Sequence, residues 1–178
     1  MTKIEIPLSK TKLIIGTTGS FIFLVLGYYM LTTIDVKQSI IYSIFIKTFG
    51  IAGIIFFGTT GVYGLKKMFD KKFGLTIDEN GITDNSNMSS TGLIKWKDIT
   101  EIKIKQVRST PCFLIFTNDN DKYLEKASRF KRRLMNGNMK MYGTPLSITA
   151  NTLNYNFDEL EKLLNEKFKE QQNKMPNR

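Results

Sequence analysis

Residues 13–34, LIIGTTGSFIFLVLGYYMLTTI, form an uncharged run that is long enough to cross a lipid bilayer. As a helix these 22 residues would span about 33 Å, and the hydrocarbon core of a bilayer is about 30 Å thick. A cleaved signal peptide would have a shorter apolar region followed by small residues, whereas Tyr28 and Tyr29 stand in that place here. We therefore expect a retained transmembrane helix.

A second uncharged run, TFGIAGIIFFGTTGVYGL, occupies residues 48–65. Its 18 residues would span about 27 Å as a helix. Residues 39–46 are also apolar, so Lys47 interrupts a longer stretch, and we expect its ammonium group to extend toward the lipid headgroups. The sequence predicts a transmembrane hairpin within residues 1–72, with helices at about 13–34 and 44–65.

Small residues suggest how the two helices would pack. The string Gly-Thr-Thr-Gly occurs in both helices, at 16–19 and 58–61. In lipid, small side chains let helix backbones approach and gain van der Waals contact. The expected packing stripe consists of Gly16, Gly19, Gly50, Gly53, Gly61 and Gly64. The same stripe would also serve a homodimer, and the sequence leaves both alternatives open.

Lysines flanking the hairpin indicate its orientation. Three precede the first helix and four follow the second: Lys3, Lys10, Lys12, Lys66, Lys67, Lys71 and Lys72. The connection between the helices contains only Lys37 and Lys47, with Asp35. Because positive flanks stay in the cytoplasm, both termini are predicted to be cytoplasmic.

The charge balance favours an anionic partner. The chain has 26 Lys and Arg against 16 Asp and Glu, a net charge of +10. For a tethered domain, the anionic lipid surface is favoured over nucleic acid. The chain has one cysteine, Cys112, and no histidine, and it contains no phosphate-binding glycine loop, CxxC pair or HExxH motif. We expect no catalysis, no cofactor and no metal site.

Alternating apolar residues predict an antiparallel sheet after residue 73. Asn80-Gly81 is typical of a hairpin turn, here between a strand at 73–77 and one beginning at Ile82. Further strands are expected at 93–96, 99–107, 112–117 and 146–149, which gives six or seven in total. We expect a curved or barrel-like sheet.

Two helices are predicted in this domain, which is expected to occupy residues 73–171. One covers 122–137 and ends at Gly137, with apolar Leu124, Ala127, Phe130 and Leu134 on one face. The other covers 157–171, capped by Asn156 with Glu159 three residues later, and its amphipathic pattern predicts packing over the sheet. Residues 172–178 are expected to form a flexible tail.

Two segments of the domain resemble a known family. Residues 75–82, LTIDENGI, precede IKWKDI at 94–99 and Ile102, an order similar to that of bacterial pleckstrin-homology-like domains. Those domains have a strand–turn–strand before a W-x-D-I-x-x-I segment, commonly with a two-helix membrane hairpin upstream. The resemblance implies a bent seven-stranded barrel with a capping helix and a bacterial cytoplasmic membrane location. The helix at 122–137 departs from the simplest form of the family.

Two groups of residues are candidates for special roles. Trp96 and Asp98 are expected to be structural, the first in the core and the second bonding backbone amides at a turn. Cationic residues on the opposite face of the 122–137 helix are candidates for binding phospholipid headgroups or an acidic partner. Those on that face are Lys122, Lys126, Arg129, Arg132 and Arg133, and Lys131 is a further candidate. A solvated helix face that only maintains solubility is the alternative.

The sequence thus favours a membrane-anchored, non-catalytic interaction module that binds a protein partner or anionic lipid. One alternative is an immunity or accessory protein that blocks a toxin or steadies a membrane complex. Another is a small transporter or channel, which would have to be oligomeric to form a pore.

Overall fold

The chain forms two units that interleave along the sequence. A computed structural model describes residues 2–33, 40–107 and 110–174. One unit comprises residues 10–71, and the other combines residues 1–9 with residues 72–178. Residues 1–9 thus belong to the same unit as residues 72–178, and the second junction between the units lies next to the boundary expected at residue 72.

The first unit is a pair of long apolar helices, α1 (Lys10–Thr33) and α2 (Ile40–Met68). Both are long and apolar enough to cross a membrane, and only 17% and 11% of the residues in their most apolar windows are buried. Large side chains such as Ile15, Tyr28 and Phe56 are more than half exposed. The helix α2 begins at Ile40, four residues before the predicted start, so Lys47 lies inside it. The intervening residues 34–39 are outside the described part of the chain.

Glycine and hydroxyl groups line the contact between α1 and α2. A Cβ atom added at Gly50 or Gly64 would meet Leu31 or Thr17 of the other helix at less than 3 Å, and one added at Gly61 would lie 3.5 Å from Ser20. Across the same contact Ser20 and Thr60 share a hydrogen bond of 3.2 Å between their hydroxyl oxygens.

Three glycines of the predicted stripe lie outside this contact. A Cβ added at Gly16, Gly19 or Gly53 would meet nothing within 4 Å. Gly27, which the predicted stripe omits, faces Ile54 and the Gly50 carbonyl of α2. The spacing of glycines alone does not predict which of them contact the other helix. The contact also depends on the positions of large side chains of the other helix, such as Leu31.

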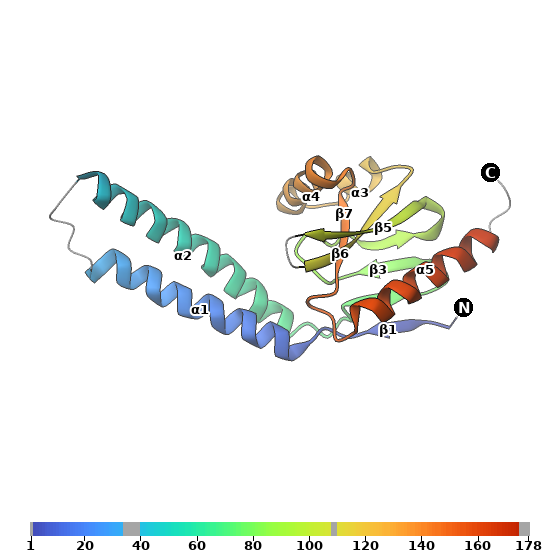
Figure 1. Cartoon of the computed structure of the whole chain (residues 1–178), viewed down its shortest axis with the longest axis horizontal. Helices are drawn as coiled ribbons and strands as arrows, with labels where there is room; N and C mark the ends of the chain where they lie inside the picture. Colours follow the sequence, from blue (N-terminus) through green and yellow to red (C-terminus); the bar gives the residue numbers. More distant parts are fainter. Residues whose placement is uncertain (1, 34–39, 108–109, 175–178) are drawn as a thin grey trace. The chain divides into compact units, whose positions relative to one another are not determined.

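The second unit contains two antiparallel sheets, shown in Figure 1. The first has the order β1-β2-β3-β4, formed by Ile4–Ile6, Leu75–Ile77, Gly81–Asp84 and Gly92–Lys95. The second has the order β5-β6-β7, formed by Ile99–Val107, Thr110–Thr117 and Leu146–Thr149. A short 3₁₀ helix, η1 (Trp96–Asp98), joins β4 to β5. Residues 108 and 109, in the connection from β5 to β6, are not described.

The edge strand β1 precedes the helical hairpin, and its partner follows the hairpin. Ile4 lies opposite Ile77, and Ile6 lies opposite Leu75. The next residues continue this attachment, since Ser9 donates its amide to the Thr152 carbonyl at 2.8 Å. Along the sequence, α1 and α2 thus lie between β1 and β2, which are neighbouring strands of one sheet.

Helix α5 (Phe157–Lys174) covers the core of this unit (Figure 1). Asn156 begins it as predicted, because its side-chain oxygen accepts the amides of Asp158 at 2.8 Å and Glu159 at 3.3 Å. The Phe113 and Phe157 rings stack at 4.7 Å between centroids. The core contains fully buried residues from both sheets and from α5: Ile6, Leu75, Ile77, Ile82, Ile94, Phe113, Ile115, Ile148, Leu160 and Leu164.

The predicted helix at 122–137 is two helices, α3 (Asp121–Glu125) and α4 (Arg129–Tyr142). Helix α4 does not stop at Gly137 but at Gly143, whose φ of +80° is the left-handed conformation common after a helix C-terminus. The break shifts the phase of the apolar residues. As a result Met135 is fully buried, whereas Phe130, predicted for the apolar face, is 54% exposed.

Candidate functional site

Helix α4 lies between β6 and β7 in the sequence and is attached to the domain along one side. Met135 is its only fully buried residue within the described chain. Asn138 donates to the Ser147 hydroxyl of β7 at 3.2 Å, and Lys131 donates to the Ser90 carbonyl at 2.8 Å. These contacts fix the inward side of α4 and leave the opposite side facing solvent.

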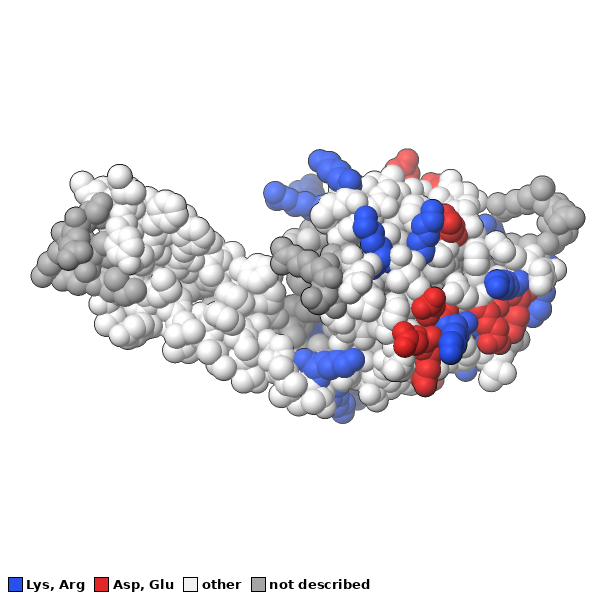
Figure 2. All heavy atoms as spheres, in the orientation of Figure 1, with Lys and Arg blue, Asp and Glu red and all other residues white. Residues whose placement is uncertain are grey.

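A row of basic side chains follows the outer side of α4. At about 100° per residue, Arg129, Arg133 and Lys140 fall within about 40° of one another around the helix axis. All three are exposed, and with Arg132, Asn136 and Gly137 they line an open hollow of about 510 Å³. We call Arg129, Arg133 and Lys140 the basic row. In Figure 2, Lys and Arg side chains project where Figure 1 places α4.

A row of apolar side chains runs beside the basic row. Phe130, Leu134 and Met141 also fall within about 40° of one another, about 100° around the helix from the basic row. Their exposed fractions are 54%, 36% and 62%. They line an open groove of about 780 Å³ together with Arg133, Gly137 and residues of the 87–89 loop and β7. We call these three residues the apolar row.

The six cationic residues predicted to bind lipid or a partner have different surroundings. Three are engaged within the domain: Lys122 pairs with Asp98, Lys131 binds the Ser90 carbonyl, and Arg132 donates to the Leu124 and Glu125 carbonyls at 2.8 and 3.0 Å. Lys126, Arg129 and Arg133 are exposed. Lys140 joins Arg129 and Arg133 on the basic row; it was not among the predicted residues because the helix was predicted to end at Gly137.

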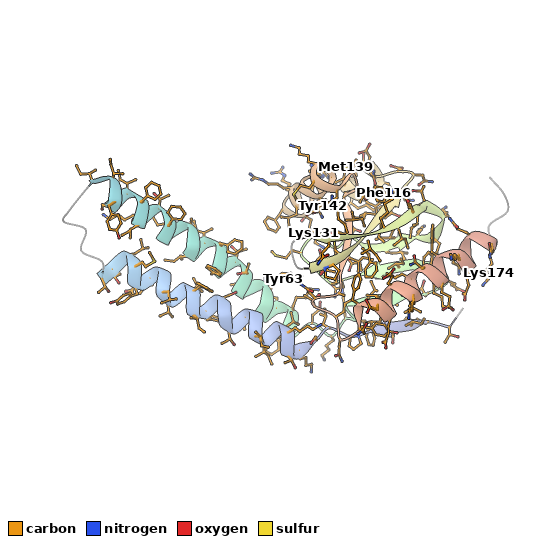
Figure 3. The ribbon with its side chains drawn as sticks, viewed as in Figure 1. Tyr63, Phe116, Lys131, Met139, Tyr142 and Lys174 are labelled. Carbon is orange, nitrogen blue, oxygen red and sulfur yellow. The ribbon has the colours of Figure 1, made fainter. Side chains whose placement is uncertain are left out.

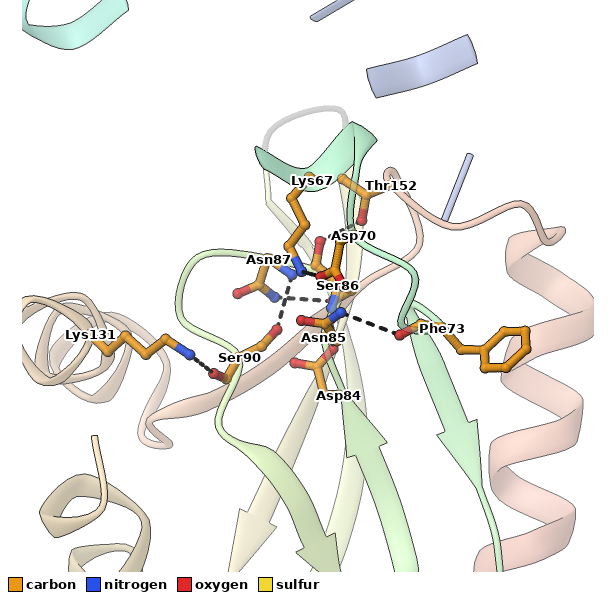
Figure 4. A network of polar contacts seen from close by, with 10 residues as sticks. All are labelled: Lys67, Asp70, Phe73, Asp84, Asn85, Ser86, Asn87, Ser90, Lys131 and Thr152. Carbon is orange, nitrogen blue, oxygen red and sulfur yellow. Dashed lines mark hydrogen bonds and ion pairs between the residues drawn. The ribbon is translucent and has the colours of Figure 1, made fainter. Parts of the chain in front are cut away.

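Lys131 donates to the loop of residues 86–90, and polar contacts hold this loop in place (Figure 4). The Ser90 hydroxyl accepts the Asn87 amide at 2.9 Å, and the Asn87 side chain donates to the Ser147 carbonyl at 2.9 Å. Thr152 donates to the Ser86 carbonyl at 2.6 Å. Lys131 therefore contacts a loop with a fixed conformation, and its role is to position α4.

Asp98 and Trp96 have structural contacts. The Asp98 carboxylate, 5% exposed, accepts the Tyr123 hydroxyl at 2.7 Å and pairs with Lys122. It thus binds side chains of α3 rather than the backbone amides expected from the sequence. The Trp96 indole is buried as expected and donates to the Asp78 carbonyl at 2.7 Å.

These contacts shift two pKa values in opposite directions. Burial works to raise the pKa of Asp98, but its hydrogen bonds from Lys122 and Tyr123 and the Lys122 charge outweigh burial and lower it. Burial and the bond to Asp98 raise the pKa of Tyr123 well above its ordinary value. At neutral pH the pair is therefore an ionised carboxylate that accepts a bond from a neutral phenol.

Cys112 is buried in β6, as expected for a small core residue. Burial raises the pKa of its thiol, and the Lys105 charge opposes this effect. In the described part of the chain, no group of three or more His, Cys, Asp or Glu side chains is placed to hold a metal ion.

Lysines of β5 extend the positive surface near the end of α4. The Lys105 ammonium lies 5.1 Å from the centre of the Tyr142 ring, and the Lys103 ammonium lies 5.1 Å from that of Phe116. Figure 3 labels Tyr142 and Met139 on α4 and Phe116 on β6. These contacts place two further cations beside aromatic rings of α4 and β6.

Comparison with known protein families matches residues 2–126 to DUF5381, a family of unknown function. The chain belongs to this family. The match runs from β1 through the helical hairpin to the end of α3, so the inserted hairpin lies within the DUF5381 region. Helix α4 begins three residues after the matched region of this DUF5381 chain. No curated protein and no solved structure matches the chain.

Proposed function

We propose that this DUF5381 chain is a membrane-anchored, non-catalytic interaction module. In this proposal α1 and α2 cross the bacterial cytoplasmic membrane as a hairpin. The domain formed by residues 1–9 and 72–178 lies on the cytoplasmic side and binds its ligand or partner through the outer side of α4.

The pairing of β1 with β2 carries the proposal. Because Ile4–Ile6 and Leu75–Ile77 belong to one sheet, residues before α1 and residues after α2 have to lie on the same side of any membrane that the helices cross. Two crossings satisfy this requirement, whereas one crossing does not. The exposed apolar surfaces of both helices support the same arrangement, since such surface is unfavourable in water.

The distribution of lysines supports a cytoplasmic domain. Lys10 and Lys12 lie in the first turn of α1, and Lys66 and Lys67 lie in the last turn of α2. These are the two ends of the hairpin that join the sheet domain. Positively charged ends of a hairpin remain in the cytoplasm.

A pleckstrin-homology-like classification of the sheet domain is part of the proposal. The resemblance implies seven strands and a capping helix, and the described residues form four strands in one sheet, three in another, and the helix α5. The segment LTIDENGI covers β2 and the start of β3, and the W-x-D-I segment covers η1 and the start of β5. These positions agree with the order of elements that the resemblance implies.

Carbonate extraction and cysteine labelling test the anchoring. In a Cys112→Ala background, single cysteines replace Lys3, Ile40 or Lys174 in the full-length chain. We expect the protein to stay in membranes at alkaline pH, and a membrane-impermeant maleimide to label only the Ile40→Cys variant in spheroplasts. The proposal would be contradicted if one of Lys3→Cys and Lys174→Cys were labelled in spheroplasts and the other were not. Release of the protein by carbonate would also contradict it.

A further inference from the structure

The outer side of α4 combines two features that a buried helix does not show. Only Met135 is fully buried in this helix of 14 residues, and the apolar row stays exposed beside the basic row. Exposed apolar side chains in one continuous row mark a surface that is covered in the functional state. The chemistry of the neighbouring charges indicates what covers it.

The charge of α4 has one sign. Its sequence, RFKRRLMNGNMKMY, contains five cations and no acidic residue. Lys131 and Arg132 bind backbone carbonyls of the domain, whereas no side-chain hydrogen bond or ion pair joins the basic row to any other described residue. A helix with this composition would bind a surface that is densely anionic.

We infer that α4 is an interfacial helix that lies on an anionic lipid leaflet. Its basic row would bind headgroup phosphates, and its apolar row would enter the upper acyl region. A leaflet presents phosphate and hydrocarbon side by side at different depths, which matches two adjacent rows on one helix. This inference rests on the proposed membrane anchoring and names the ligand class of the α4 surface.

The connections to the hairpin favour lipid over a diffusing protein partner. Only residues 7–9 separate β1 from α1, and residues 69–74 separate α2 from β2. Fully extended, the first connection reaches only about 10 Å. If the hairpin spans the membrane, the domain is held beside the leaflet, and the effective concentration of headgroups is high. A protein that binds the same surface would have to compete with them.

A fluorescence experiment on the full-length chain in vesicles tests the inference. Met141→Cys in the Cys112→Ala background is labelled with bimane, and lipid nitroxides report contact with acyl chains. We expect quenching in vesicles that contain phosphatidylglycerol and little quenching in pure phosphatidylcholine. The triple variant Arg129→Gln, Arg133→Gln, Lys140→Gln should lower the docking equilibrium constant about 100-fold at low salt, because each cation contributes about fivefold.

A matched control removes the same charge elsewhere. Lys162, Lys169 and Lys174 are exposed on α5, and changing all three to Gln should leave quenching at position 141 unchanged. An equal loss in both triple variants would overturn the inference, because net charge alone would then explain binding. So would quenching that does not depend on phosphatidylglycerol.

The outcomes separate this inference from the anchoring proposal. If the chain resists carbonate but the label at position 141 stays unquenched in anionic vesicles, α4 is not a lipid surface, and a protein partner becomes the better explanation of its exposed rows. If carbonate releases the chain, the anchoring proposal itself fails. Retention in the membrane together with phosphatidylglycerol-dependent quenching supports both.

Discussion

Asp98 illustrates how one buried carboxylate ties two parts of the domain together. It lies in η1, and both of its side-chain partners, Lys122 and Tyr123, come from α3. The Tyr123 hydroxyl in turn accepts the Lys95 amide at 3.2 Å. Breaking this network leaves buried polar groups without partners, which costs more than the loss of an exposed ion pair.

We therefore expect Asp98→Asn to destabilise the domain by about 1.5–3 kcal/mol at neutral pH, the usual range for hydrogen bonds to a charged group. Since the folded state lowers the pKa of Asp98 below its ordinary value of 3.8, ionisation stabilises the fold above that value. This contribution is lost as the pH falls through the lowered pKa. Thermal unfolding in detergent should give a lower melting temperature for Asp98→Asn than for the original chain, and this difference should shrink as the pH is lowered. A difference in melting temperature that does not depend on pH would contradict this assignment.

Gly137 offers a prediction of the opposite sign. It lies inside α4, and an added Cβ would meet no atom within 4 Å. Gly137→Ala should stabilise the domain by about 0.5–1 kcal/mol, because alanine loses less backbone entropy in a helix. Gly143→Ala is the matched comparison, since its φ of +80° should make the same change destabilising by about 1 kcal/mol. Denaturant unfolding of the two variants checks the signs, and a shift in the same direction for both would be inconsistent with the helix boundary at Gly143.

At the level of elements, the packing of α1 on α2 depends on particular glycines. Gly64→Leu should place its side chain against Thr17 and destabilise the hairpin by about 1–3 kcal/mol. Gly53→Leu adds the same volume where nothing lies within 4 Å, so we expect a change within about 0.5 kcal/mol. The apparent melting temperatures of the two variants in one detergent give the comparison. Equal losses would mean that Gly64 does not line the helix contact.

The sequence predicted those elements that depend on local pattern. The two apolar helices follow from the length of their uncharged runs, and the β2–β3 turn follows from Asn80-Gly81, where an added Cβ at Gly81 would meet the backbone of Ile94. The capping of α5 by Asn156 is equally local. Each of these features can be recognised from a continuous stretch of sequence.

Features that depend on distant residues were not predicted. Strand β1 has only three residues, and its partner lies about seventy residues later in the chain, so no local pattern identifies it. The break between α3 and α4 contains no proline or glycine, and it is stabilised by Arg132 reaching back to two carbonyls of α3. Separately, the helix end predicted at Gly137 left Lys140 of the basic row outside the predicted cationic set.

For the whole molecule, the order of the two units along the chain indicates how the domain of residues 1–9 and 72–178 can be isolated. Replacing residues 10–71 by a flexible Gly/Ser linker should give a domain that is folded and monodisperse without detergent, since it retains β1. A chain beginning at Lys72 lacks Ile6, which is 1% exposed, and should be less stable by at least about 2–5 kcal/mol, the cost of removing one buried large apolar side chain. Urea unfolding compares the two, and equal midpoints would show that β1 contributes nothing to the sheet.

The position of β1 also has a consequence for the order of events during synthesis. The ribosome produces this strand first, yet its partner strand emerges only after both apolar helices have been made. If the helices enter the bilayer as proposed, the residues of β1 stay unpaired until β2 has been made, and closure of the sheet is a late, long-range step that slows folding. Under the proposed anchoring, pairing of β1 with β2 requires both ends of the hairpin to lie on one side of the membrane. A wrongly inserted chain would then expose an unpaired sheet edge at β2 and be open to aggregation.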